Sequence, residues 1–140
     1  MFSDVSQAFA RVWHPGLLYK IKKHLPTFYP LLKAYISNRR FRRRVKGEVS
    51  ALFPINSGVL QGSVLGPVLY LLFKSDFPQA PDFTTGTFAD DSVILNCHTD
   101  VLRASSCLQE YLNILQNWFH TWEIKINESK STYLTFTLRV

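Results

Sequence analysis

The chain has 140 residues, of which 46% are hydrophobic and 14% aromatic, a composition that supports one folded domain and excludes a disordered segment. The formal charge of +6 is unevenly placed, because residues 1–50 hold 11 Lys and Arg against 2 Asp and Glu, whereas residues 51–140 hold 5 against 8. The first part therefore suits a polyanionic partner, and the second carries the acids that a metal ion would need.

The first half of the chain predicts a strand and several helices. Residues 2–6 have the pattern of a short strand, and Pro15 opens a helix with its leucines and isoleucine on one side. A second apolar pattern at 29–37 predicts another helix. A loop bounded by glycines at 58–62 then leads into an apolar helix at 64–73.

The second half predicts a hairpin, a long helix and a closing pair of strands. The hairpin strands are expected at 84–88 and 92–96, the helix at 100–122, and the short strands at 125–127 and 132–137. The apolar stripe of the long helix is interpreted as core and consists of Val101, Ala104, Leu108, Tyr111, Leu112, Leu115, Trp118, Phe119 and Trp122. The fold class expected from this order is α+β, an antiparallel sheet with helices packed on one face.

Adjacent acids, Asp90 and Asp91, lie at the predicted tip of the hairpin. Their mutual repulsion costs roughly 1–4 kcal/mol at a few Å, and a hard cation such as Mg²⁺ removes it. A plain turn is the alternative, since Asp is a good turn residue. A third acid, Asp4, ends the first predicted strand. If that strand lies beside the hairpin, the three carboxylates could hold two Mg²⁺ ions about 3.5–4 Å apart.

Other classes of site find no support in the sequence. The cysteines, Cys97 and Cys107, lack the paired spacing of a zinc site, and nothing indicates an oxidising compartment. The amino-terminal residues do not have the pattern of a signal peptide, and the longest apolar run is too short for a bilayer. We therefore expect a soluble, intracellular chain without a membrane partner, with nucleus and cytoplasm both open.

Three ordered blocks resemble the reverse transcriptases. They are Asp4-Val-Ser-Gln-Ala-Phe9, the block from Gly58 to Tyr70, and Phe88-Ala-Asp-Asp91. Together they closely resemble the palm of non-LTR retrotransposon polymerases, nearest to the jockey type of arthropod genomes. Supporting stretches are 11–18, 52–56 and 125–131. The resemblance covers nearly the whole chain and implies RNA-directed DNA synthesis from an RNA template, a DNA primer and deoxynucleoside triphosphates.

The resemblance implies roles for the acids and for the residues that follow Asp4. Asp4 and Asp90 match the essential metal ligands, with Asp91 as the neighbouring carboxylate, and the cofactor would be two Mg²⁺ ions, with Mn²⁺ as a substitute. Phe9 matches the bulky residue that stacks under the sugar and favours deoxynucleotides, although a core phenylalanine is the equal alternative. The residues expected to offer backbone amides near the triphosphate are Val5, Ser6, Gln7 and Ala8.

Two later positions are also implied by the resemblance. Gln61, with Gly58 and Gly62, matches the loop under the template and incoming nucleotide, where glycine permits close backbone approach. The alternative for these glycines is a strand-to-helix turn. Lys130 matches a lysine that could donate a proton to the departing pyrophosphate, and a solvated lysine is the competing interpretation.

A basic hairpin is expected before the glycine loop. Its strands would span 41–45 and 48–53, joined by a turn at Lys46-Gly47. The cations gathered there are Arg39, Arg40, Arg42, Arg43, Arg44 and Lys46. Cations along a strand suit phosphate contacts, which give affinity but no sequence recognition. Charge on an edge strand also prevents aggregation. The family resemblance favours nucleic-acid contact.

Several features argue against a working enzyme. Ala10 stands where the family has an acid, Leu60 stands where it has a proline that fixes the loop backbone, and Ser3 stands where it prefers an apolar residue. The fingers and thumb that the family implies are missing, so residues 1–140 are interpreted as a palm truncated at both ends. Because polymerisation depends on positioning and electrostatic stabilisation, we expect negligible activity from the isolated chain.

Three hypotheses therefore stand. The first is an RNA-directed DNA polymerase palm, the second a non-catalytic nucleic-acid-binding remnant of a mobile element, and the third an ordinary α+β domain whose acids form turns. The sequence leaves the oligomeric state open.

Overall fold

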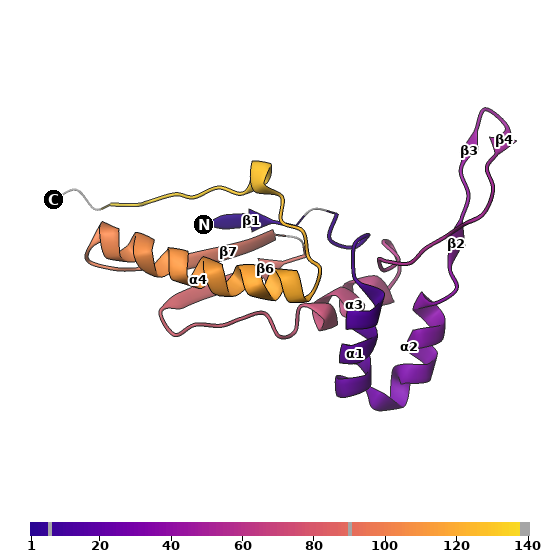
Figure 1. The fold of residues 1–140 in the computed structure, drawn as a ribbon, viewed down its shortest axis with the longest axis horizontal. Coiled ribbons are helices and arrows are strands. Elements are labelled where there is room, and N and C mark those ends of the chain that lie inside the picture. Colours follow the sequence, from indigo (N-terminus) through magenta and orange to yellow (C-terminus); the bar gives the residue numbers. More distant parts are fainter. Residues whose placement is uncertain (6, 90, 138–140) are drawn as a thin grey trace. The chain divides into compact units, whose positions relative to one another are not determined.

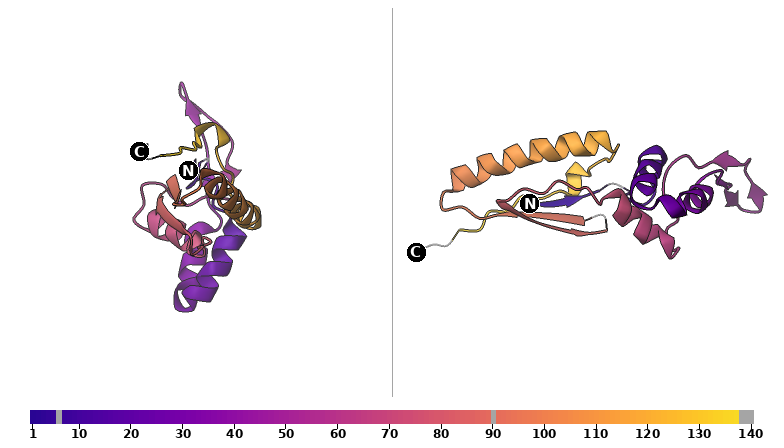
Figure 2. Two further views of the ribbon diagram at one scale, coloured as in Figure 1. Left: turned by 90° about the vertical axis from the view of Figure 1, so that its left-hand side faces the viewer. Right: turned by 90° about the horizontal axis from the view of Figure 1, so that it is seen from below.

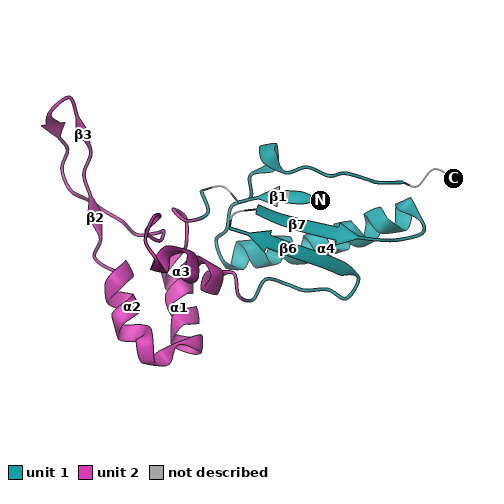
Figure 3. Cartoon of the chain, turned by 180° about the vertical axis from the view of Figure 1, so that it is seen from behind, with its two compact units in different colours: residues 1–8, 76–140 teal, residues 9–75 magenta. Residues whose placement is uncertain are grey.

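The computed structural model describes residues 1–5, 7–89 and 91–137. The chain divides into two compact units, which Figure 3 distinguishes by colour: unit 1 comprises residues 1–8 and 76–140, and unit 2 comprises residues 9–75. The expectation of one domain over 1–140 stays a prediction. Within the described ranges, no helix combines the length and the hydrophobicity needed to cross a bilayer.

Unit 1 is built on an antiparallel sheet with the strand order β1, β7, β6 (Figure 1). Its strands are β1 (Phe2–Asp4), β6 (Phe83–Phe88) and β7 (Asp91–Asn96). The predicted hairpin is confirmed, and each strand begins one residue earlier than expected. The strand predicted at 2–6 is shorter, because only residues 2–4 pair with β7 and Val5 forms an isolated bridge to Ile126.

The long helix α4 (Val101–Thr121) covers one face of this sheet (Figure 2). Asp100 caps its amino end by accepting a hydrogen bond from the Leu102 amide at 3.0 Å. The buried core that joins helix and sheet consists of Phe77, Ile94, Leu108, Tyr111, Leu115, Trp118 and Phe119. Val101, expected in the apolar stripe, is instead 46% exposed, because the buried part of the helix begins only at Leu108.

The carboxyl end of α4 turns the chain back toward β1. Glu123 has φ +53°, and the Ile124 amide donates to the Phe119 carbonyl at 2.9 Å, which is the hydrogen bond of a Schellman cap. Phe119 belongs to the core of unit 1, and the partly buried Ile124 packs against it. This cap therefore determines where the following residues meet the sheet.

The strands predicted at 125–127 and 132–137 are wrong. Ile126 and Thr132 form isolated bridges to Val5 and Phe2, and the short helix η2 (Glu128–Lys130) interrupts the segment between them. The physical reason is the length of the partner strand. Since Thr132 faces Phe2, residues 134–137 run past β1 and find no strand residue to pair with in the described part of unit 1.

Unit 2 contains the predicted helices, here α1 (His14–His24), α2 (Tyr29–Ile36) and α3 (Leu65–Phe73), with the turn η1 (Pro26–Phe28) between the first two. All three helices are confirmed to within about two residues at each end. Helix α1 packs against both α2 and α3. The core of this unit consists of Val12, Leu17, Ile21, Leu32, Ile36, Val59, Leu69, Tyr70 and Phe73.

The basic hairpin of unit 2 is one ribbon, residues 39–55, interrupted by a bulge. Strands β3 (Arg44–Val45) and β4 (Glu48–Val49) pair next to the turn, and β2 (Arg40–Phe41) pairs with β5 (Phe53–Pro54) near the root. The Ser50 amide donates to the Arg43 carbonyl at 2.9 Å, so Arg42 alone lies opposite both Ala51 and Leu52. An extra residue on one strand is a β-bulge, and it breaks the predicted continuous strands into short ladders.

Candidate active site

Asp4 lies at the end of β1, and its backbone contacts a neighbouring segment on each side. On one side it pairs with Asp91 of β7. On the other, the Asn127 amide donates to the Asp4 carbonyl at 2.8 Å, immediately after the Ile126–Val5 bridge. The cap of α4 thus supplies the segment that fixes the position of Asp4.

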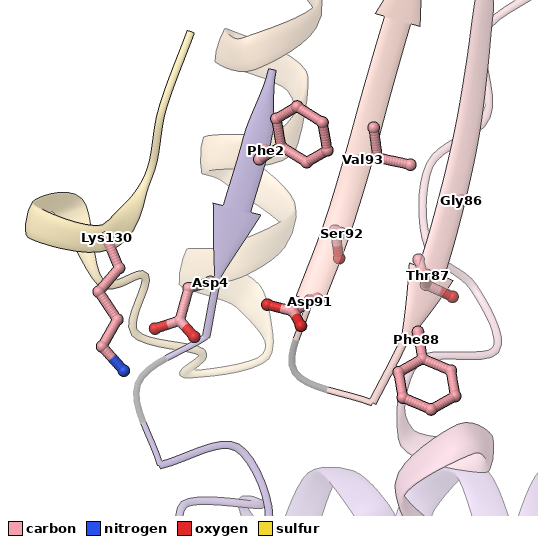
Figure 4. Close-up of a pocket in the computed structure, with 9 residues that line it drawn as sticks. All are labelled: Phe2, Asp4, Gly86, Thr87, Phe88, Asp91, Ser92, Val93 and Lys130. Atoms are coloured by element: carbon pink, nitrogen blue, oxygen red, sulfur yellow. The ribbon is translucent and has the colours of Figure 1, made fainter.

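Asp4 and Asp91 are directly opposite each other in the antiparallel register. Residues in such a pair have Cβ atoms about 4.5–5.5 Å apart, and like charges there are destabilising. Asp4 is half-buried and Asp91 exposed, and both face a hollow of about 550 Å³ (Figure 4). The hollow is lined by Phe2, Asp4, Gly86, Thr87, Phe88, Asp91, Ser92, Val93 and Lys130.

Lys130 reaches the same hollow from η2. The turn is fixed by the Ser131 amide, which donates to the Asn127 carbonyl at 3.1 Å. In Figure 4 the Lys130 amine and the Asp4 carboxylate extend toward one another from neighbouring segments. The structure thus brings together Asp4, Asp91 and Lys130, which are 126 positions apart at their extremes (130 − 4).

The tip of the β6–β7 hairpin carries backbone strain. Phe88 pairs with Asp91, so Ala89 and Asp90 make the connection. Ala89 has φ +49°, a conformation that costs a non-glycine residue about 1–2 kcal/mol. Asp90, the expected metal ligand, lies outside the described residues, as does Ser6, so both assignments stay predictions.

The carboxylates of Asp4 and Asp91 are chemically suited to bind a divalent cation. Within residues 1–5, 7–89 and 91–137, no three His, Cys, Asp or Glu side chains come together as a metal site. Asp4 and Asp91 are therefore the described members of the predicted set. Their oxygens are the hard ligands that Mg²⁺ prefers, and a cation between them would relieve the cross-strand repulsion.

The other predicted residues of unit 1 follow Asp4. The side chains of Val5 and Ala8 are both 6% exposed, so what these residues can offer a ligand is their backbone. Gln7 is exposed and has φ +53°. These features agree with a backbone role near a triphosphate, and that role stays a prediction.

Phe9 belongs to unit 2 and packs against Tyr70 of α3. The two rings are stacked with centroids 4.8 Å apart and planes at 28°. Phe9 is nevertheless only half-buried. Its packing role is thus observed, and its predicted contact with a sugar stays a prediction.

The glycine loop of unit 2 is anchored at its first residue. The Gly58 amide donates to the Val12 carbonyl at 2.8 Å, and the Val59 amide to the Phe9 carbonyl at 2.7 Å. Gly58 has φ +86°, and a Cβ there would lie 2.6 Å from the Ala10 carbonyl oxygen. Gln61 and Gly62 follow on the exposed part of the loop.

The residues predicted to contact nucleic acid fall into two groups, one at the root of the ribbon and one farther along it. Arg39 lies at the root, where its Nη1 donates to the Gly58 carbonyl at 3.3 Å. The cations farther along the ribbon are all exposed: Arg40, Arg42, Arg43, Arg44 and Lys46. Arg39 therefore links the ribbon to the glycine loop, which the sequence did not indicate.

Several residues at these sites were missed by the sequence analysis. Thr87 and Ser92 pair across the hairpin and line the hollow beside Asp91. Their position in the predicted hairpin strands, close to the acidic tip, was the available signal. Phe88 lines the hollow while 83% exposed. His14, whose Nε2 lies 2.8 Å from the Gly58 carbonyl, carried no signal, since it is isolated in sequence.

Comparison with known proteins identifies the family. Residues 1–139 match the family of reverse transcriptases (RNA-dependent DNA polymerases), and the chain belongs to it. It is 44% identical, over 99% of its length, to the RNA-directed DNA polymerase from mobile element jockey of Drosophila melanogaster. It is 42% identical, over 97% of its length, to the corresponding protein of Drosophila funebris. A probable RNA-directed DNA polymerase from transposon BS of Drosophila melanogaster is 40% identical over 99% of the chain.

The chain spans about 16% of the length of each of these relatives. The resemblance inferred from the motifs is thereby confirmed at the level of the family. The α+β class is also consistent with the mixture of helices and small antiparallel sheets.

Proposed function

We propose that the chain is the palm segment of an RNA-directed DNA polymerase, which joins a deoxynucleotide to the 3′-end of a primer on an RNA template. The observation that carries this proposal is the antiparallel pairing of Asp4 with Asp91 beside the hollow that Lys130 also lines. Two acids face each other there at a cost in stability, which a functional metal site explains.

In this proposal Asp4, Asp90 and Asp91 hold two Mg²⁺ ions, which Mn²⁺ can replace. When bound, such ions activate the attacking hydroxyl and stabilise the leaving oxygen. Lys130, which lines the same hollow, would protonate the departing pyrophosphate. The family resemblance assigns nucleotide contacts to the backbone of residues 5–8 in unit 1 and, separately, to Phe9, Gln61 and Gly62 in unit 2.

Metal-dependent nucleotide binding tests the site in the chain itself. Mg²⁺ with a deoxynucleoside triphosphate at ten times its dissociation constant should stabilise the chain by about 1.4 kcal/mol. Asp91→Asn should abolish this stabilisation. Without metal, the same variant should be more stable by about 0.2–1 kcal/mol, because the cross-strand repulsion is gone. Asp82→Asn, an exposed acid outside the hollow, is the matched control and should leave the metal effect unchanged.

Catalysis is tested by replacing the homologous segment of the Drosophila melanogaster jockey polymerase with this chain. We expect the 140-residue chain alone to extend primers negligibly, because it corresponds to 16% of that relative. The chimera should extend a DNA primer on RNA with Mg²⁺, and Asp4→Asn and Asp91→Asn should each abolish extension. A chimera that works equally well with either substitution would contradict the proposal.

A second candidate is favoured by the exposed cations of the ribbon. A non-catalytic nucleic-acid-binding protein would need the ribbon and not the acids. Its binding should persist or tighten in Asp91→Asn and should fall steeply with salt. Binding of this kind together with an inactive chimera would select this candidate.

A further inference from the structure

The basic ribbon, residues 39–55, extends away from the helices of unit 2 (Figures 1 and 3). It is held as a hairpin by hydrogen bonds on both sides of the bulge, from the Ile55 amide to the Arg39 carbonyl at 2.9 Å at the root to the β3–β4 pair beside the turn. Every residue from 40 to 54 is exposed. The ribbon is thus an ordered arm whose side chains are available to a partner.

The ribbon combines positive charge with exposed apolar groups. Its Arg and Lys residues number six against a single acid, Glu48, which gives a net charge of +5. The large apolar side chains exposed along it are Phe41, Val45, Val49, Leu52 and Phe53. Charge that served only to keep an edge strand soluble would not require aromatic rings beside it. A ligand that matches both features carries phosphates and flat apolar rings.

Phe41 and Phe53 form the aromatic part of this surface. They are directly opposite each other in the β2–β5 pair, with ring centroids 5.8 Å apart and planes at 36°. They remain 42% and 49% exposed, unlike the core pair Phe83 and Tyr111, of which Tyr111 is 2% exposed. In an extended strand residues two apart share a face, so Arg43 is expected on the side of the Phe41 ring, and Arg40, Arg42 and Arg44 on the opposite side.

We propose that the ribbon binds an unpaired RNA strand, with a base stacked on the Phe41–Phe53 pair. The phosphates would be contacted by Arg43 on the same face and, around the edge of the ribbon, by the long side chains of Arg40, Arg42 and Arg44. Base faces are accessible to aromatic side chains only where the strand is unpaired, so a duplex can use the cations but not the rings. This inference rests on the proposed function and deepens it, because the RNA template is the single strand that such a polymerase would bind. It can fail independently, since it needs no metal and no acid.

The test is fluorescence anisotropy of the 140-residue chain with a labelled oligouridine of about 15 nucleotides, a length within the range of single-strand sites. EDTA keeps the measurement independent of the metal site. The comparison ligands are a duplex of the same length, single-stranded DNA, and an oligoribonucleotide lacking its central bases. Wild-type chain should bind the intact RNA about fivefold or more tightly than the strand without central bases. It should bind RNA at least as tightly as DNA.

Phe41→Leu/Phe53→Leu keeps the apolar character of the ribbon and removes the aromatic faces. This double variant should bind intact RNA about fivefold or more weakly, and it should no longer distinguish the intact strand from the one lacking bases. Its binding to duplex should not change. Phe28→Leu, an exposed phenylalanine of η1 outside the ribbon, is the matched control and should behave as wild type.

The charge variant Arg42→Gln/Arg44→Gln should weaken single strand and duplex alike. Its salt dependence on single-stranded RNA should fall by roughly 1 to 1.5 in the slope of log K against log salt. Circular dichroism verifies that the variants fold. Equal binding of intact and base-free strands by wild-type chain would reduce the ribbon to a general polyanion surface and overturn the inference. A clear preference for duplex or for DNA would also overturn it.

Discussion

Two regions of the molecule are paired antiparallel strands: the β1–β7 edge, in which residues 2–4 pair with residues 91–93, and the basic ribbon. They are stabilised in opposite ways. At the edge, Asp4 is held between β7 and residue 127, and the sheet below it is packed on α4. In the ribbon, residues 40–54 are exposed, and at its root Arg39 donates a hydrogen bond to the Gly58 carbonyl.

The difference indicates what each region can do. Carboxylates that must share a cation need fixed geometry, which the core of unit 1 provides. A strand-binding arm gains from exposed side chains and tolerates local opening, since such segments unfold at little cost. Substitutions should therefore act on stability at the edge and on binding in the ribbon.

A pair of leucine truncations tests this contrast most strongly. Leu115→Ala removes a side chain that is 1% exposed in the core of unit 1 and should lower the free energy of unfolding by about 2–5 kcal/mol. Leu52→Ala removes the same atoms at the bulge, where Leu52 is 56% exposed, and should change it by about 0.5 kcal/mol or less. Urea denaturation measures both. Equal losses would mean that the ribbon belongs to the cooperative core.

Two glycines of unit 2 sharpen the comparison. Gly58→Ala introduces left-handed strain of about 1–2 kcal/mol and a clash with the Ala10 carbonyl that adds roughly 1–3 kcal/mol. Gly47→Ala carries similar strain at φ +92° in the ribbon turn, but its Cβ meets nothing within 4 Å, and the exposed turn can open locally without unfolding the core. Thermal unfolding should thus show a marked loss for Gly58→Ala and little change for Gly47→Ala. The reverse order would show that the glycine loop is not anchored as described.

Replacing two strained turn residues with glycine tests the same contrast through an expected gain in stability. Glu123, at φ +53°, ends α4, so Glu123→Gly should raise the free energy of unfolding by about 1 kcal/mol. Lys46, at φ +48°, has the same strain in the ribbon turn. Lys46→Gly should leave global stability unchanged, because the ribbon opens locally without the core. Chemical denaturation distinguishes the two, and an equal gain would contradict the proposed independence of the ribbon.

The smallest effect concerns alkaline pH. Burial raises the pKa of the Tyr111 phenol, which donates to the Pro78 carbonyl at 2.6 Å, above its ordinary value. The unfolded chain therefore loses this proton first, and stability should fall as the pH rises from about 10 through the higher folded pKa. Denaturation of Tyr111→Phe should lack this part of the pH dependence. An unchanged profile would show that Tyr111 ionises normally in the fold.

Local patterns predicted the elements well, because helix periodicity and turn residues act over a few positions. The hairpin around Asp91 and the helices from Pro15 and near Asp100 follow from such signals. Pairing at a distance could not be derived in this way. The approach of Asp4 to Asp91 was expected only through the family resemblance, and the structure brings the two together.

The failures have physical causes of the same kind. Residues 132–137 have strand-like composition, but pairing depends on the partner: Thr132 bridges Phe2, the first residue of β1, and the residues from 134 on run past that strand. The bulge at Ala51 and Leu52 depends on the register of the opposite strand. The stacking of Phe9 on Tyr70 and the contact of Arg39 with Gly58 join segments far apart in sequence, which periodicity does not address.

Paramagnetic broadening by Mn²⁺ tests the metal site most directly. In amide NMR spectra of the chain, small amounts of Mn²⁺ should selectively broaden the signals of Asp4, Asp91 and their strand neighbours, and Asp4→Asn should remove the effect. Broadening that avoids the β1–β7 edge, or that survives Asp4→Asn unchanged, would contradict a cation held between these two carboxylates.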